Sequence, residues 1–170
     1  LVFLSTAITL LIAEYGLRLL APNLASEPVT SNQYNFYRYD PLLGWSNIPD
    51  ARGTFSRAEF SYELNINSLG LRGAEITMEK PAGTRRIAVL GDSFVWGIGA
   101  AEPELFTTLL ADSLPATQVL NFGVAGYSPI QHHLLTDKVL ALDPDLVIIS
   151  FCLGNDFADA VYWNRYDYYK

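Results

Sequence analysis

The sequence predicts an α/β domain with a parallel sheet, preceded by an apolar helix and a small strand-containing segment. Three observations support this prediction: an apolar stretch at the N-terminus, three short apolar runs that alternate with helix-like segments after residue 85, and a composition that is 50% hydrophobic over 170 residues, enough for one substantial core. We divide the chain into a transmembrane or signal-anchor helix (1–20), a linker (21–33), a strand and loop segment that packs on the core (34–84), and the first part of the α/β domain (85–170).

The N-terminal stretch carries no charge before Glu14. Twenty helical residues span about 30 Å, the thickness of a bilayer core. Glu14 and Arg18 are four residues apart, so they can pair or reach the headgroups. Neither a basic start nor a small-residue cleavage site precedes Ala21-Pro22, which favours an uncleaved anchor over a signal peptide; a buried or amphipathic helix of a soluble protein is the alternative. We expect a membrane-anchored protein with an extracytoplasmic domain, although the sequence does not set the orientation.

Composition excludes several classes of partner. The net charge of −7 and the pI near 4.7 argue against nucleic acid, because phosphate binding requires a basic face. Glu102 stands where a dinucleotide fingerprint would need its third glycine after Gly99, and the chain has no Gly-Lys-Ser/Thr phosphate loop. No three His, Cys or carboxylate residues have metal-ligand spacing. We therefore predict neither a cofactor nor a metal.

The segment before the α/β domain carries turn and strand signals. Asn23–Asn32 is polar and indicates a tether. An aromatic-rich stretch follows, with turn signals at Asp40-Pro41 and Gly44, and the loose alternation over Thr54–Ile66 predicts one or two strands, possibly a hairpin. Asn67–Gly73, NSLGLRG, indicates a structured loop in which Arg72 ties to a carboxylate. We interpret this loop as a lid or brace, with direct ligand contact as the alternative.

From residue 86 onward the pattern is βαβαβ. The predicted strands are Ile87–Leu90, Val119–Phe122 and Leu146–Phe151, and the predicted helices cover about Pro103–Leu114 and Ser128–Leu142. Apolar runs with few polar interruptions are typical of strands that are buried on both faces. The pattern therefore predicts a three-layer α/β/α arrangement around a parallel sheet.

Each predicted strand is followed by polar or glycine-rich residues, and in a parallel sheet these segments meet at one edge. Ser93 follows the first strand in Gly91-Asp92-Ser93, beside backbone N–H groups at a helix start, which suit an anionic intermediate. Gly126 has no Cβ, so its N–H can approach a reacting oxygen, and Asn155 offers an amide donor. A plain strand-to-helix turn with a capping residue is the alternative for the first tripeptide. The α/β-hydrolase pattern G-x-S-x-G is absent.

These three segments resemble three sequence blocks of the SGNH, or GDSL-type, hydrolase superfamily. The resemblance covers Arg86–Asp156 in order and spacing, through Gly91-Asp92-Ser93, the glycine of NFGVAGYS, and Gly154-Asn155-Asp156. The upstream DPLLGW and NSLGLRG segments also resemble those of membrane-anchored members. The resemblance implies a flavodoxin-like SGNH fold, Ser93 as the nucleophile, and Gly126 and Asn155 as further oxyanion-hole donors.

The superfamily's fourth block, Asp-x-x-His, does not occur in these 170 residues. We therefore expect this block beyond Lys170, and little activity from the 170 residues alone, because a serine hydroxyl needs an adjacent base. The two histidines, His132 and His133, are neighbours on a predicted helix and point about 100° apart. We interpret them as surface or helix-packing residues, with neither at a strand end.

The function that these residues predict is ester hydrolysis through an acyl-serine intermediate, on a small-molecule or glycan ester. Two alternatives stay open: a surface-polysaccharide O-acyltransferase or deacetylase, and a non-catalytic binding or assembly domain on the same fold. Trp96 and Tyr127 lie next to the motifs, where they either stack on a sugar ring or belong to the core or its rim.

Overall fold

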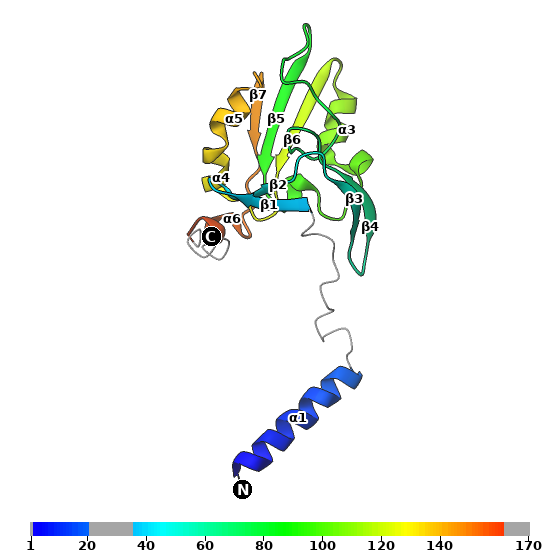
Figure 1. Cartoon of the computed structure of the whole chain (residues 1–170), viewed down its shortest axis with the longest axis vertical. Helices are drawn as coiled ribbons and strands as arrows, with labels where there is room; N and C mark the ends of the chain where they lie inside the picture. Colours follow the sequence, from blue (N-terminus) through cyan, green and yellow to red (C-terminus); the bar gives the residue numbers. More distant parts are fainter. Residues whose placement is uncertain (1, 21–35, 162–170) are drawn as a thin grey trace. The chain divides into compact units, whose positions relative to one another are not determined.

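The computed structural model describes residues 2–20 and 36–161. The chain divides into two units, residues 1–31 and 32–170, each of which is described by itself. The first contains one helix, α1 (Val2–Leu20), and the second contains all the strands (Figure 1). The predicted linker, residues 21–33, lies outside the described residues.

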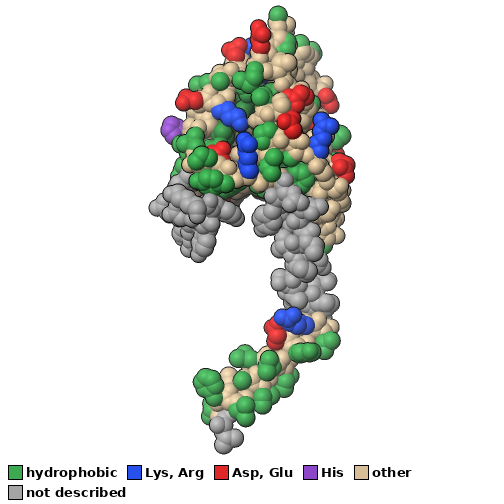
Figure 2. Space-filling model, in the orientation of Figure 1, with side chains coloured by type: hydrophobic (Ala, Val, Ile, Leu, Met, Phe, Trp, Pro, Cys, Tyr) green, Lys and Arg blue, Asp and Glu red, His purple; other side chains and the backbone are tan. Residues whose placement is uncertain are grey.

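Helix α1 is long and apolar enough to cross a membrane over Val2–Leu19, and that span is not buried. Figure 2 shows apolar side chains along the helix and charged side chains near one of its ends. The charged pair is Glu14 and Arg18, joined by an ion pair of 2.7 Å. The predicted N-terminal helix is thus confirmed. Helices of this length and composition occur both as membrane spans and as signal sequences.

The second unit begins with two antiparallel hairpins. The first joins β1 (Tyr37–Asp40) to β2 (Gly44–Asn47), and the second joins β3 (Arg52–Ser56) to β4 (Ser61–Asn65). The Asp40 carboxylate closes the first turn by accepting two backbone N–H hydrogen bonds of 2.9 Å. The hairpin predicted over Thr54–Ile66 is confirmed. The second hairpin packs its buried aromatic and aliphatic side chains against Trp96.

The central sheet has three parallel strands in the order β6-β5-β7 (Figure 1). They are β5 (Arg85–Gly91), β6 (Thr117–Gly123) and β7 (Leu146–Ile149). Gly91 pairs with Gly123, and the neighbouring Leu90 pairs with Ile149. The three carboxyl ends therefore lie at one edge. A mixed α/β architecture with a parallel sheet, as predicted, is confirmed.

Short helices connect the strands: α2 (Ser93–Trp96), the 3₁₀ turn η3 (Glu102–Glu104), α3 (Phe106–Ser113), α4 (Pro129–Leu134), α5 (Thr136–Leu140) and α6 (Asp156–Val161). Both predicted long helices are interrupted. Leu105 has an extended backbone between η3 and α3, and its side chain is buried over Gly97. Leu135 is buried at the junction of α4 and α5. The first break follows from the extended backbone of Leu105, whereas Leu135 keeps a helical backbone and separates α4 from α5 by one residue.

Core side chains cover both faces of β5. Ala88 and Leu90 belong to a cluster that includes Val139 of α5, whereas Ile87 and Val89 pack with Val95 of α2. Alternate residues of a strand point to opposite faces, so the two clusters lie on opposite sides of the sheet. Helical segments therefore contact β5 from both sides, as the buried apolar run predicts.

Strand β7 does not follow the prediction that every strand is buried on both faces. Its four residues, Leu146 to Ile149, are 36% to 59% exposed. The reason is its position: β7 is an edge strand that pairs only with β5, and the described elements leave its side chains uncovered. An apolar run therefore identified the strand but not its burial.

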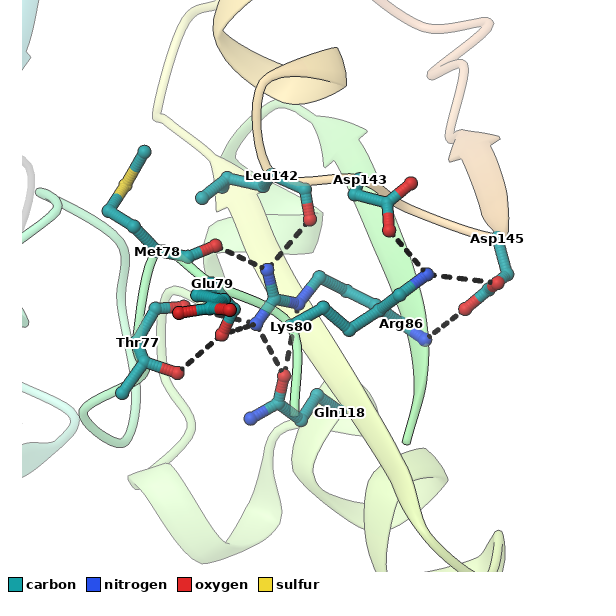
Figure 3. Close-up of polar contacts among 9 residues, drawn as sticks. All are labelled: Thr77, Met78, Glu79, Lys80, Arg86, Gln118, Leu142, Asp143 and Asp145. Atoms are coloured by element: carbon teal, nitrogen blue, oxygen red, sulfur yellow. Dashed lines mark hydrogen bonds and ion pairs between the residues drawn. The ribbon is translucent and has the colours of Figure 1, made fainter. Parts of the chain in front are cut away.

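Arg86 begins the buried part of β5 and is itself fully buried (Figure 3). Its guanidinium donates hydrogen bonds of 2.7–3.0 Å to four oxygen atoms, namely Thr77 O, Met78 O, Leu142 O and Gln118 Oε1. The Asp145 carboxylate accepts a hydrogen bond from the Arg86 backbone N–H and forms an ion pair with Lys80. This network ties the segment before β5 to β6 and to the loop before β7.

Candidate functional site

Ser93 is positioned by a tight turn between β5 and α2. The Asp92 carboxylate accepts a hydrogen bond of 2.9 Å from Phe94 N, so Asp92 caps α2. Helix α2 lies so close to β6 that a Cβ at Gly123 would stand 2.2 Å from Trp96 N. A glycine at the end of β6 is therefore necessary for α2, and with it Ser93, to sit against the sheet edge.

Ser93 lines a cavity of about 490 Å³. Most of the wall is apolar, from Phe94, Ile98, Leu105 and Phe106, and the charged residues Arg57 and Glu104 also line it. Phe94 is 72% exposed and Phe106 is 47% exposed, which is unusual for large apolar side chains away from binding surfaces. Within residues 36–161, no hydrogen-bond partner engages Ser93 Oγ. The hydroxyl is thus available at the wall of an apolar cavity.

Arg72 braces the segment that follows Ser93. Its guanidinium donates hydrogen bonds of 2.5–2.6 Å to the carbonyl oxygens of Trp96, Gly97 and Ala100. It also lies 4.6 Å from the Trp96 ring centroid, a cation–π contact. The prediction that Arg72 binds a carboxylate is therefore wrong, since backbone carbonyls take that place. The brace interpretation of the NSLGLRG loop agrees with these contacts.

Gly126 stands in the loop after β6 with a left-handed backbone, φ +81°. A Cβ there would meet the Trp45 indole at 3.1 Å, and Trp45 Nε1 donates to Ala125 O at 3.0 Å. Tyr127 returns a hydrogen bond of 2.6 Å to Trp45 O. The loop that carries Gly126 is therefore held by β2. Sequence reasoning gave Trp45 no role, although the DPLLGW resemblance pointed to its segment.

Asn155 immediately precedes α6. Its Nδ2 donates a hydrogen bond of 2.8 Å to Asp159 Oδ2 one turn later. An amide NH₂ has two donors, so one N–H is left for another acceptor. Asp156 caps the same turn, because its Oδ2 accepts from Cys152 N at 2.8 Å. The orientation of the Asn155 amide is thus set by Asp159.

The sheet register places the segments of Ser93, Gly126 and Asn155 at one edge, since each follows the carboxyl end of a parallel strand. The cavity wall at Ser93, however, includes neither Gly126 nor Asn155. The structure brings together the strand ends and places Ser93 in a cavity. A shared oxyanion site of the three residues stays a prediction.

Three aromatic or imidazole side chains require a correction. Trp96 and Tyr127 are fully buried, so the sugar-stacking alternative is wrong and the core interpretation holds. His133 is exposed, but His132 is buried, and its imidazole lies beside the Gly91 carbonyl. The expectation that neither histidine lies at a strand end is therefore wrong for His132. Helix α4 starts a few residues after β6, so its first turn stays next to the sheet edge.

No group of three or more His, Cys, Asp or Glu side chains within residues 2–20 and 36–161 is arranged to hold a metal ion. No family model and no curated protein matches the chain. The functional assignment therefore depends on the residues at the sheet edge and on the cavity at Ser93.

Proposed function

We propose that this chain carries the nucleophile of a serine ester hydrolase of the SGNH type. The observation that carries the proposal is Ser93: a hydroxyl with no partner in the described part of the chain, at the carboxyl end of the central strand, in the wall of an apolar cavity. Sites in open α/β sheets gather at this edge. The sequence blocks around Ser93, Gly126 and Asn155 support the same assignment.

The proposed reaction has two acyl-transfer steps. A histidine, expected from an Asp-x-x-His block, takes the proton from Ser93 Oγ as the oxygen attacks the ester carbonyl carbon. The carbonyl π electrons move to oxygen, and the resulting oxyanion accepts hydrogen bonds from Ser93 N–H, Gly126 N–H and the Asn155 amide. Collapse expels the alcohol, which takes the proton from the imidazolium. Water then repeats the sequence on the acyl-serine and releases the acid.

The cavity supports an ester with an apolar acyl group as the substrate. Phe94 and Phe106 offer exposed apolar surface next to the hydroxyl, and burying one CH₂ contributes about 0.8 kcal/mol. An acetyl group would leave most of this wall in water. The glycan alternative loses its proposed stacking residues, because Trp96 and Tyr127 are buried.

We also propose that α1 anchors the protein in a membrane and that the folded domain is extracytoplasmic. The support is the apolar span of α1, whose only charges, Glu14 and Arg18, pair near its end. Protease added to intact cells is expected to digest the domain while α1 stays in the membrane fraction. Protection of the domain until the cells are lysed would reverse the orientation.

The function is tested with p-nitrophenyl acetate, butyrate and octanoate, and with an alkyl phosphonate that labels nucleophilic serines. We expect the full-length protein to favour butyrate over acetate by about 15-fold in kcat/KM, the ratio given by burial of two more CH₂ groups at about 0.8 kcal/mol each, and to accept octanoate at least as well as butyrate. The phosphonate is expected on Ser93, located by peptide mass spectrometry. Labelling of another serine, or ester turnover without any labelled serine, would contradict the proposal.

Alanine at position 155 is expected to lower kcat by about 10²- to 10³-fold with little change in KM, because an oxyanion donor acts only as charge develops. As a purely structural turn residue, Asn155 would instead contribute about 1 kcal/mol to stability. Asn65→Ala is the matched control, because Asn65 also carries a side-chain amide donor, but an exposed one that hydrogen-bonds to Glu102. An Asn155→Ala variant that melts lower yet turns over normally would assign Asn155 to the fold alone.

A further inference from the structure

Three titratable side chains gather below the carboxyl edge of the sheet: Asp92 of the Ser93 turn, His132 of α4, and Asp156 of α6. They are 2%, 3% and 0% exposed. The Gly91 carbonyl and both carboxylates favour the protonated imidazole of His132 electrostatically. Helix α4 packs against α6. We call this group the edge cluster.

The edge cluster is rich in buried polar atoms without hydrogen-bond partners. Both ring nitrogens of His132 lack one, as do Asp92 Oδ2 and Asp156 Oδ1. Buried polar groups are normally hydrogen-bonded, and each exception carries an energetic cost. Four such atoms on three neighbouring residues indicate a feature that packing alone does not require.

The second oxygen of each carboxylate accepts a backbone hydrogen bond in a turn at the sheet edge. Asp92 Oδ1 accepts from Phe94 N in the turn that carries Ser93, and Asp156 Oδ2 accepts from Cys152 N in the turn that carries Asn155. His132 is therefore buried near the two segments that bear the proposed nucleophile and one proposed oxyanion donor, and its own helix, α4, packs against α6.

We propose that His132 is a positioning residue: its uncharged imidazole, buried near Asp92 and Asp156, helps to hold the turns that carry Ser93 and Asn155, and protonation of the ring loosens both turns. The inference rests on the proposed function for its catalytic consequence, although the structural consequence stands by itself. The exposed neighbour His133 has no such place.

The charges around the ring act in opposite directions. Burial disfavours the imidazolium and lowers the His132 pKa, while the Gly91 carbonyl and the carboxylates of Asp156 and Asp92 raise it. Burial dominates. The folded state then binds fewer protons than the unfolded state between the lowered pKa and the ordinary value of about 6.5. The neutral ring therefore contributes fully to the free energy of unfolding above about pH 6.5, and this contribution is lost as the pH falls from there to the lowered pKa.

The pKa of Asp156 shifts in the opposite direction, so its protonation has the opposite effect on stability. Burial raises the pKa of its carboxyl, which Asp92 and Asp159 raise further and His132 and the Cys152 N–H lower. Its protonation at lower pH therefore restores stability. A variant that keeps Asp156 but has no titrating ring at position 132 separates the two effects.

The experiment is amide hydrogen exchange followed by NMR at pH 7.5 and pH 5.5 on the full-length protein. His132→Phe keeps the ring and loses the titration, and His133→Phe is the matched control. We expect the protection factors of the Phe94 and Cys152 amides to fall, by up to about tenfold, at pH 5.5 in the parent and in His133→Phe, because pH 5.5 lies about one unit below the ordinary imidazole pKa of about 6.5. In His132→Phe they are expected to stay constant.

Equal acid responses of the parent and His132→Phe, or greater protection in acid, would overturn the proposal. If His132→Phe does not fold, His132→Asn replaces it, with the same expectation. For catalysis, the parent is expected to lose kcat below pH 6 more steeply than His132→Phe, at unchanged KM. Absence of all ester turnover would contradict the proposed function, while the exchange data would still decide the role of His132.

Discussion

Alanine at position 93 is expected to lower kcat for p-nitrophenyl butyrate by about 10⁴- to 10⁶-fold, the range in which loss of a serine nucleophile leaves only oxyanion and binding effects. The change removes one oxygen atom that has no partner within the described residues. The cap of α2 involves Asp92 and Phe94 and is left intact. The melting temperature is therefore expected to stay nearly unchanged.

Ser113→Ala is the matched control, because Ser113 is also on a helix but its hydroxyl bonds only to Leu110 O, one turn earlier. Steady-state rates and thermal melts of both variants are measured on the same preparations. A Ser93→Ala variant that keeps more than a tenth of the parent rate would show that the ester carbonyl is attacked by another group. Absence of ester turnover in the parent protein itself would instead support the binding-domain alternative.

The strands could be predicted because apolar runs and turn residues are local signals. Two observed strands, β5 and β6, are longer than the predicted apolar runs by polar or glycine residues at their ends. The reason is that backbone pairing in a sheet does not require apolar side chains. The helices were harder. Periodicity predicts a continuous helix over 103–114, but the extended backbone of Leu105, whose side chain is buried over Gly97, separates η3 from α3. Such interruptions depend on tertiary packing that a local window does not contain.

The candidate site was predicted only in its local parts. The Gly91-Asp92-Ser93 turn is encoded by a strand, a glycine and a cap, all adjacent in sequence. The hydrogen bond between Trp45 and the Gly126 loop spans 80 residues. The electrostatic influence of Asp92 and Asp156 on His132 joins three separate segments of the chain. No spacing rule connects such distant residues. The sequence signal for His132 was its position three and seven residues before Leu135 and Val139, which places it on the same face of the predicted helix.

The largest effect on folding is expected from Arg86→Met. The substitution keeps much of the apolar stem but leaves the oxygen atoms of Gln118 and Leu142, among others, buried without a donor (Figure 3). A buried acceptor left without a donor costs about 1–3 kcal/mol, several are affected here, and domains of this size are stable by about 5–15 kcal/mol. We expect a marginally folded protein, measured as a shift in the urea midpoint.

Arg85→Met is the matched control, because Arg85 is the exposed neighbour on the same strand. Its replacement is expected to change the free energy of unfolding by less than about 0.5 kcal/mol. Equal effects of the two substitutions would mean that the Arg86 hydrogen bonds contribute no more than an exposed charge. A large loss confined to Arg86→Met would show that this buried guanidinium holds the start of β5, the strand that leads to Ser93, to the loops on either side.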